Sequence, residues 1–158
     1  MPPETTRRFS MAILLLATTF FVYSPSLRGD FLWDDDAYIS QNEALTSLHG
    51  LHDIWFTPGS EQQYYPATFT VFWIAHHLWG LNPLGYHALN VLLHGLNAFF
   101  VGLVLEALGV PGAWIAACFF ALHPVQAESV AWMTELKNVL STFFYLLTLL
   151  LSEIDTVH

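Results

Sequence analysis

The chain has 158 residues, of which 54% are hydrophobic, 16% aromatic and only 11% charged. Soluble domains carry roughly 25% charged residues, so this composition indicates an integral membrane protein. The net charge of -9 comes from 13 acidic residues against four bases. So few bases argue against a nucleic-acid partner, because phosphate contacts need many lysines and arginines.

The N-terminal region has the pattern of a membrane anchor. Residues 1–8 are a short polar leader, and residues 9–27 are apolar and just long enough to cross a bilayer, which takes about 20 residues. A signal peptide would look similar, but the sequence Tyr23-Ser-Pro-Ser-Leu-Arg is a poor cleavage site, which favours a retained anchor. Arg7 and Arg8 predict a cytoplasmic N-terminus by the positive-inside rule, and therefore an external loop after the anchor.

Residues 28–85 are predicted to form that external loop. Seven of the 13 acidic residues fall in its first part, which marks the segment as aqueous. Within 44–56, apolar residues recur at helical spacing, which predicts an amphipathic helix that either lies flat at the membrane interface or packs on its own protein. The apolar stretch 68–81 is short for a span, and we expect a re-entrant or interfacial helix there unless it extends beyond these limits.

The second span is predicted at 86–108, and it carries a polar stripe. His87, Asn90, His94 and Asn97 stand at i, i+3, i+7 and i+10, which places them on one face of a helix. Polar groups that face lipid without partners are costly, so this stripe should face other helices or a wet cavity. Both interhelical hydrogen bonding and direct substrate contact remain open for it.

Two further spans are predicted at 111–130 and 134–151, and the chain ends in a polar tail at 152–158 that indicates a truncation. A tight turn separates the second span from the third. Alternating directions then bring residues 123–138 to the same side of the membrane as the loop at 28–85. The predicted fold is therefore all-α, a polytopic helical membrane bundle whose two polar segments face one aqueous compartment.

Three consecutive carboxylates, Asp34, Asp35 and Asp36, are the first candidates for chemistry. Neighbouring carboxylates repel each other, so one pKa rises while another stays low. A general base and a positioning or metal-binding acid could share such a cluster, although a solvated turn would look the same.

Three residues of the second polar segment could complete the site. His123 and Glu128 have the side chains that divalent metals bind, which leaves a metal open. Lys137 stands at the start of a membrane helix, where it either reaches up to lipid head groups or binds an anion such as a lipid-linked phosphate.

An ordered series of sequence blocks resembles one known family. The blocks are Phe-Leu-Trp-Asp-Asp-Asp-Ala-Tyr at 31–38, Tyr-Tyr-Pro at 64–66, the long block at 79–97 and Phe-Ala-Leu-His-Pro-Val-Gln-Ala-Glu-Ser-Val-Ala-Trp at 120–132. Together they resemble the N-terminal part of bacterial membrane proteins with C-terminal tetratricopeptide (TPR) repeats. Those proteins are similar to the eukaryotic transmembrane-and-TPR O-mannosyltransferases.

This resemblance implies a partial GT-C-type glycosyltransferase fold in the bacterial inner membrane. Such enzymes pass a sugar from a polyprenyl-phosphate donor to a protein acceptor on the outer or lumenal face. By resemblance, Asp34 and Asp35 are the acidic pair, one of which accepts the proton of the acceptor hydroxyl. His123 and Glu128 match the external His-Pro…Glu block, and Lys137 matches a partner for the phosphate leaving group.

The family has many more spans than the four predicted here, followed by TPR repeats. We therefore expect this chain to be inactive by itself and to need the missing helices and repeats as partners. A non-catalytic membrane scaffold or assembly subunit is the main alternative, based on the short length and the polar stripe. A metal or proton transporter is disfavoured because no inverted repeat builds a pathway.

Overall fold

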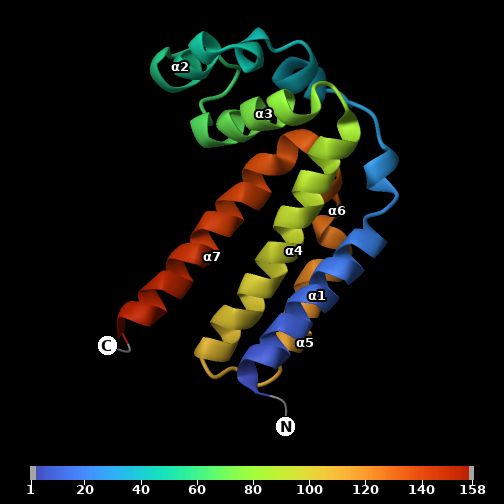
Figure 1. Ribbon diagram of the computed structural model, residues 1–158, viewed down its shortest axis with the longest axis vertical. Coiled ribbons are helices and arrows are strands. Elements are labelled where there is room, and N and C mark those ends of the chain that lie inside the picture. The colour runs from blue at the N-terminus through green and yellow to red at the C-terminus, as the bar shows by residue number, and fades with distance from the viewer. Residues whose placement is uncertain (1–2, 157–158) are drawn as a thin grey trace.

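The computed structural model describes residues 3–156, with side chains described through Ser152. Within that range the chain consists of helices, turns and loops without a strand, which confirms the predicted all-α class. The longer helices form a bundle, and two further helices cover one end of it (Figure 1). The bundle helices are α1 (Glu4–Val22), α4 (Pro83–Ala107), α5 (Ala113–Leu122) and α7 (Leu136–Thr156), and the covering helices are α2 (Leu48–Phe56) and α3 (Pro66–Trp79).

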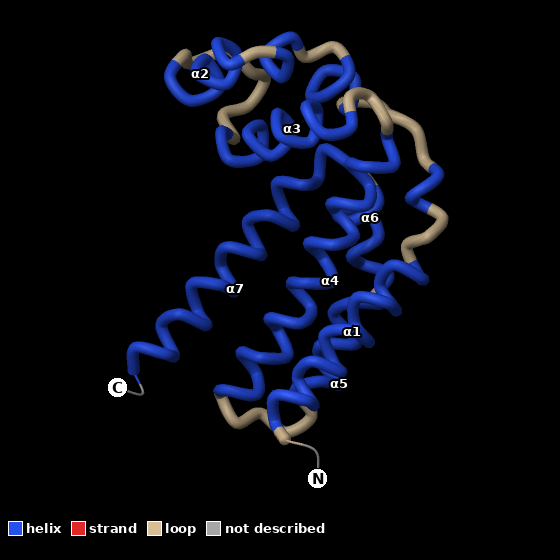
Figure 2. The backbone as a smooth tube through the Cα atoms, in the orientation of Figure 1, coloured by secondary structure: helices blue, strands red, loops and turns tan. Residues whose placement is uncertain are grey.

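Short helical turns join these elements in two groups, and Figure 2 shows the loops between the helices. The first group follows α1 and the second follows α5. They are η1 (Ser26–Arg28), η2 (Asp36–Ser40) and η3 (Glu43–Thr46), and then η4 (Pro124–Gln126), α6 (Ala127–Ala131) and η5 (Met133–Glu135). Segments about a hundred residues apart in sequence are thereby neighbours at one end of the molecule.

Helix α4 is the central element and contacts α1, α5 and α7. Its start is fixed by Pro83 in the first turn and by Asn82, whose side chain accepts a hydrogen bond from the Leu84 N–H at 3.2 Å. Its 25 residues span about 37 Å, enough for a hydrocarbon core of about 30 Å. By length and composition, it is the one helix in residues 3–156 that meets the requirements of a membrane span.

The other predicted segments differ in detail from the helices observed. Helix α1 already begins at Glu4, inside the range 1–8 predicted as a leader. The range 111–130 is not one helix, because α5 ends at Leu122 and the chain turns at Pro124 before α6. Proline has no N–H to continue the helical hydrogen bonds. Helix α7 begins at Leu136, two residues after the predicted start of 134–151.

The polar stripe of α4 joins this helix to its neighbours. All four stripe residues are buried. Asn90 Nδ2 donates to the Trp132 carbonyl at 2.9 Å, His94 Nε2 lies 3.1 Å from the Ala121 carbonyl, and Asn97 Nδ2 donates to the Val139 carbonyl at 2.8 Å. Interhelical hydrogen bonding, one of the two roles left open by the sequence, is therefore confirmed for Asn90, His94 and Asn97.

We expect Asn90→Leu to destabilise the fold by about 1 kcal/mol, because the Trp132 carbonyl loses its side-chain donor where the chain leaves α6. Thermal unfolding followed by circular dichroism in detergent measures this loss. Leu92→Ala, on the exposed face of the same helix, is the matched control and should shift the midpoint less. Equal midpoints for Asn90→Leu and the unaltered chain would contradict a stabilising role for this contact.

Helix α2 packs on α3, which is one of the two arrangements that the sequence left open. Ile54 is buried, the indole N–H of Trp55 donates to Thr70 Oγ1 at 2.9 Å, and the indole N–H of Trp73 donates to the Ser47 carbonyl at 2.9 Å. Tyr38 stacks on Phe69 of α3, with ring centroids 5.3 Å apart. The loop predicted at 28–85 therefore shares one hydrophobic core with Met133 of η5 and with Leu136 and Leu140 of α7, and this core fixes the loop on the bundle.

Candidate functional site

A tight turn at residues 32–35 positions the acidic cluster. The Asp35 N–H donates to the Leu32 carbonyl at 2.9 Å, and the Asp35 carboxylate accepts the Leu32 N–H at 3.0 Å. The other oxygen of Asp35 accepts the Thr134 N–H, also at 3.0 Å. This last bond joins segments 99 residues apart and confirms that the two polar segments meet at one end of the bundle.

Asp35 is 1% exposed, and both of its carboxylate oxygens accept backbone hydrogen bonds. Burial raises the pKa of Asp35 above its ordinary value, the hydrogen bonds from Leu32 and Thr134 act in the opposite direction, and the charge of Asp34 adds to the rise. Its geometry suits a residue that holds the turn in place, because neither oxygen is left to meet a substrate.

Asp34 has the opposite environment, because it is exposed in the same turn. Its charge is close enough to raise the pKa values of both Asp35 and Tyr38. Asp36, the third carboxylate, is bound within η2, where its Oδ1 accepts the Ser40 hydroxyl at 2.7 Å. Asp34 thus differs from Asp35 in being exposed and from Asp36 in having no side-chain hydrogen bond among the described residues.

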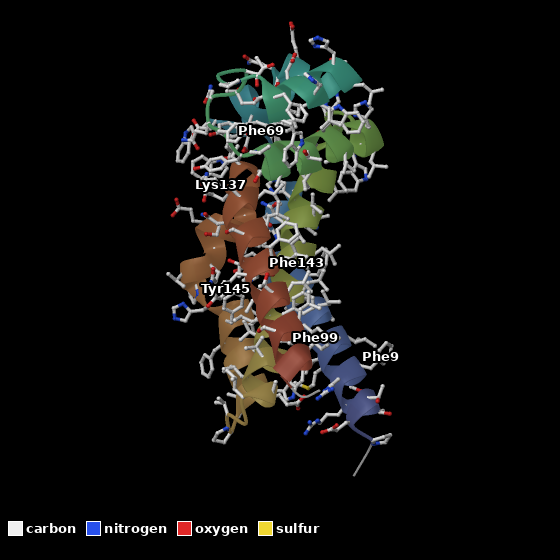
Figure 3. All side chains as sticks on the ribbon, turned by 90° about the vertical axis from the view of Figure 1, so that its left-hand side faces the viewer. Phe9, Phe69, Phe99, Lys137, Phe143 and Tyr145 are labelled. Atoms are coloured by element: carbon white, nitrogen blue, oxygen red, sulfur yellow. The ribbon has the colours of Figure 1, made fainter. Side chains whose placement is uncertain are left out.

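Lys137 lies at the end of α7 that meets α3 (Figure 3). Its Nζ donates to Glu135 Oε1 at 2.7 Å. Burial raises the pKa of the nearby Tyr38 hydroxyl most, the charge of Lys137 lowers it, and that of Asp34 raises it. The charges of Lys137 and Asp34 thus act on the pKa of Tyr38 in opposite directions.

A groove of about 430 Å³ opens beside Lys137, between the start of α3 and the first turns of α7. Grooves of this size accept small molecules or parts of larger ones. Its lining is largely apolar and aromatic with one cation, which suits an anionic head group attached to a hydrocarbon chain. The lining residues are Tyr64, Tyr65, Pro66, Ala67, Thr68, Lys137, Asn138, Leu140, Ser141 and Phe144.

A second groove, also of about 430 Å³, lies between the 32–35 turn and the segment around α6. Its walls are Leu32, Trp33, Glu128, Ala131 and Trp132. The rings of Trp33 and Trp132 meet edge to face, with centroids 5.4 Å apart at an angle of 80°. Glu128 is thus brought next to the acidic turn, as the sequence predicted.

His123 is placed differently from the other predicted residues. It is exposed, its Nδ1 accepts the Val125 N–H at 3.2 Å, and it borders a cavity beside α5 rather than either groove described above. Among the described side chains, no three of His, Cys, Asp or Glu are arranged to hold a metal ion. The metal site of acidic residues, His123 and Glu128 that the sequence left open is therefore not assembled in that part of the chain.

Several residues of the site were not among the candidates chosen from the sequence. Glu135, which binds Lys137, could have been found from its position two residues earlier. Tyr64 and Tyr65 stand in one of the blocks that carry the family resemblance, which was a usable signal. The hydrogen bond from the Thr134 N–H to Asp35 has no local signal in the sequence, because it joins residues 99 positions apart.

Comparison with known proteins places these residues in a family context. No family model and no solved structure matches the chain. It is 34% identical over 140 residues to mouse protein O-mannosyl-transferase TMTC2 and 33% identical over 146 residues to Tmtc1 of Drosophila melanogaster. It is 30% identical over 153 residues to protein O-mannosyl-transferase F38B6.6 of Caenorhabditis elegans.

These matches cover 82%, 85% and 88% of this chain, respectively. The chain in turn spans only 17% of the length of the first two relatives and 22% of the third. Over most of its own length, the chain is therefore related in sequence to the transmembrane-and-TPR O-mannosyltransferases, the family that its motifs resemble.

Proposed function

We propose that this chain is the N-terminal part of a GT-C-type membrane glycosyltransferase. The reaction moves a mannosyl group from a polyprenyl-phosphate carrier to a hydroxyl group of a protein. The names of the relatives support the reaction class. The observation that carries the proposal is a groove suited to a lipid phosphate beside the half-buried Lys137, at the end of the bundle where the nearby Thr134 N–H binds Asp35, the neighbour of exposed Asp34.

In the proposed reaction, Asp34 accepts the proton of the acceptor hydroxyl while the hydroxyl oxygen attacks the anomeric carbon of the sugar. The bond between that carbon and the phosphate oxygen breaks, and the phosphate leaves with the electron pair. Lys137 stabilises the charge that develops on the phosphate. Glu135 holds the Lys137 ammonium in place, and Asp35 holds the turn that carries Asp34.

The proposed orientation puts Asp34 and Lys137 at the outer face of a bacterial inner membrane and the N-terminus in the cytoplasm. Arg7 and Arg8 lie at the opposite end, where both bind Glu106 at the end of α4. The four spans predicted from the sequence remain part of this proposal. Further helices and TPR repeats, which the family resemblance implies, would complete the donor site and bind the acceptor protein.

The proposal is tested first by binding of polyprenyl phosphate to the purified chain in lipid nanodiscs. We expect Lys137→Gln to weaken this binding about tenfold, because a charge-assisted hydrogen bond to phosphate is lost. Arg28→Gln removes an exposed cation at the start of the loop predicted at 28–85 and should change the affinity much less. If both substitutions weaken binding equally, the affinity reflects net charge and the Lys137 groove is not the phosphate site.

A further inference from the structure

Trp33 has two energetically unfavourable features, a positive φ and an exposed indole. Its φ of 49° makes it the one residue other than glycine with a positive φ in residues 3–156. A left-handed backbone costs a residue with a side chain about 1–2 kcal/mol. Its indole is also 81% exposed, one of the most exposed large apolar side chains of the chain. Strain of this kind persists only where the surroundings impose it, and it is typical of functional sites.

The surroundings of Trp33 do impose this conformation. The 32–35 turn is closed by the hydrogen bonds of Asp35, and Asp35 is itself fastened to Thr134. The ring of Trp33 is oriented by its edge-to-face contact with Trp132. The fold therefore holds an indole away from the core with most of its surface accessible.

The groove beside this indole has a definite chemical character. It combines two indoles, the apolar side chains of Leu32 and Ala131 and the exposed carboxylate of Glu128, and none of its lining residues is a base. An ionised carboxylate only accepts hydrogen bonds, so the preferred ligand carries donors and no negative charge. A pyranose ring fits these requirements, because its C–H face stacks on an aromatic ring while its hydroxyl groups donate at the ring edge.

We propose that the groove formed by Trp33, Trp132 and Glu128 binds the pyranose ring of a neutral sugar. Trp33 stacks on the C–H face of the ring, and Glu128 accepts hydrogen bonds from its hydroxyl groups. This inference rests on the proposed function, since it places a sugar beside Asp34 while the Lys137 groove receives the phosphate. It assigns Trp33, Trp132 and Glu128 to sugar recognition rather than to proton transfer.

The test uses ¹⁹F NMR of the chain labelled with 5-fluorotryptophan and titrated with methyl α-D-mannopyranoside. The six tryptophans give resonances that single substitutions assign. The detergent must not be a glycoside, because its head group would compete for the groove. We expect the Trp33 and Trp132 resonances to shift with the sugar and those of the other tryptophans to stay unchanged.

Variants then separate sugar binding from general effects. Trp33→Ala should abolish the shift of the Trp132 resonance, and Glu128→Gln should weaken binding about tenfold. Phe56→Ala and Glu43→Gln change an exposed aromatic and an exposed carboxylate outside the groove and should leave the titration unchanged. Because all four side chains are exposed, circular dichroism should show the same thermal unfolding for each variant.

A second comparison identifies the source of the sugar. If the groove holds the sugar of the donor, Trp33→Ala weakens binding of polyprenyl-phosphate mannose but not of polyprenyl phosphate. If it holds a sugar already attached to the acceptor, Trp33→Ala instead weakens binding of a mannosylated peptide. Either result supports the pyranose site.

The proposal is overturned if methyl α-D-mannopyranoside shifts neither resonance, or if the shift of Trp132 persists in Trp33→Ala. A groove that responds to an unglycosylated serine- and threonine-containing peptide, and not to the sugar, would be a peptide site. The proposed function can fail separately: sugar binding would then remain while Lys137→Gln leaves polyprenyl phosphate binding unchanged.

Discussion

Asp34→Asn is expected to lower mannosyl transfer by about 10²- to 10⁴-fold, the usual contribution of a general base. The amide of asparagine cannot accept the proton of the acceptor hydroxyl. Asp34 is exposed, while the turn that carries it is held by Asp35. The substitution should therefore leave thermal stability and polyprenyl phosphate binding unchanged, so that the loss is confined to the chemical step.

The measurement is made on membranes from cells that carry the substitution in the chromosomal gene, so that the protein is present in its natural length. Transfer of radiolabelled mannose from polyprenyl-phosphate mannose to a serine- and threonine-containing peptide gives the rate. Asp36→Asn is the matched control, since this neighbouring carboxylate binds Ser40 within η2. If Asp34→Asn transfers mannose as fast as Asp36→Asn, Asp34 is not the general base of the reaction.

Asp35→Asn is expected to destabilise the fold by about 1–3 kcal/mol, the cost of leaving a buried donor without an acceptor. Both oxygens of Asp35 accept backbone N–H groups. Asparagine supplies only one oxygen, and its NH₂ group would face the Leu32 or the Thr134 N–H as a second donor. The turn should loosen from η5, and transfer should fall with it because Asp34 loses its fixed position.

The pH dependence of this effect follows from the raised pKa of Asp35. The native state holds the Asp35 proton more tightly than the unfolded state, where the pKa is near 3.8. The native state thus binds more protons between these two pKa values, so its stability falls as pH rises through that interval. Asparagine does not titrate, so the stability advantage of the wild-type chain over Asp35→Asn should be largest below pH 3.8 and smaller above the folded pKa.

Chemical unfolding of the wild-type chain and of Asp35→Asn at several pH values measures both effects. Asp30→Asn serves as the control, because Asp30 is exposed and accepts only the N–H of its neighbour Phe31. A stability difference that grows as pH rises through the folded pKa would show that ionised Asp35 is favoured by the fold, contrary to the effect of burial. If Asp35→Asn and the wild-type chain are equally stable at every pH, the two hydrogen bonds of Asp35 do not contribute to the stability of the fold.

The sequence predicted the parts of this molecule that depend on composition and periodicity. Four polar residues at helical spacing indicated a buried stripe on one helix, and three of them make interhelical contacts. The alternating direction of the apolar segments predicted that the acidic loop and the segment around Glu128 would meet. The hydrogen bond from Thr134 to Asp35 confirms that meeting.

The division of roles among the three carboxylates could not be predicted, because they are equivalent in sequence. Asp35 is distinguished by a backbone N–H donor 99 residues away, a tertiary contact without a local signal. The positive φ of Trp33 was equally hidden, since glycine or asparagine is the usual residue for that backbone conformation. The span predicted at 111–130 is divided in the structure, because α5 ends at Leu122 and the chain turns at Pro124.

The most direct test of the central claim is a double-mutant cycle that compares transfer rates of the wild-type protein, Asp34→Asn, Lys137→Gln and the double variant. Residues that act in one transition state show strongly non-additive effects. If Asp34 and Lys137 serve the same sugar transfer, the double variant should be about as slow as the slower single variant. If the two losses multiply, or if Lys137→Gln leaves the rate unchanged, the two residues do not form one site and the proposed mechanism is contradicted.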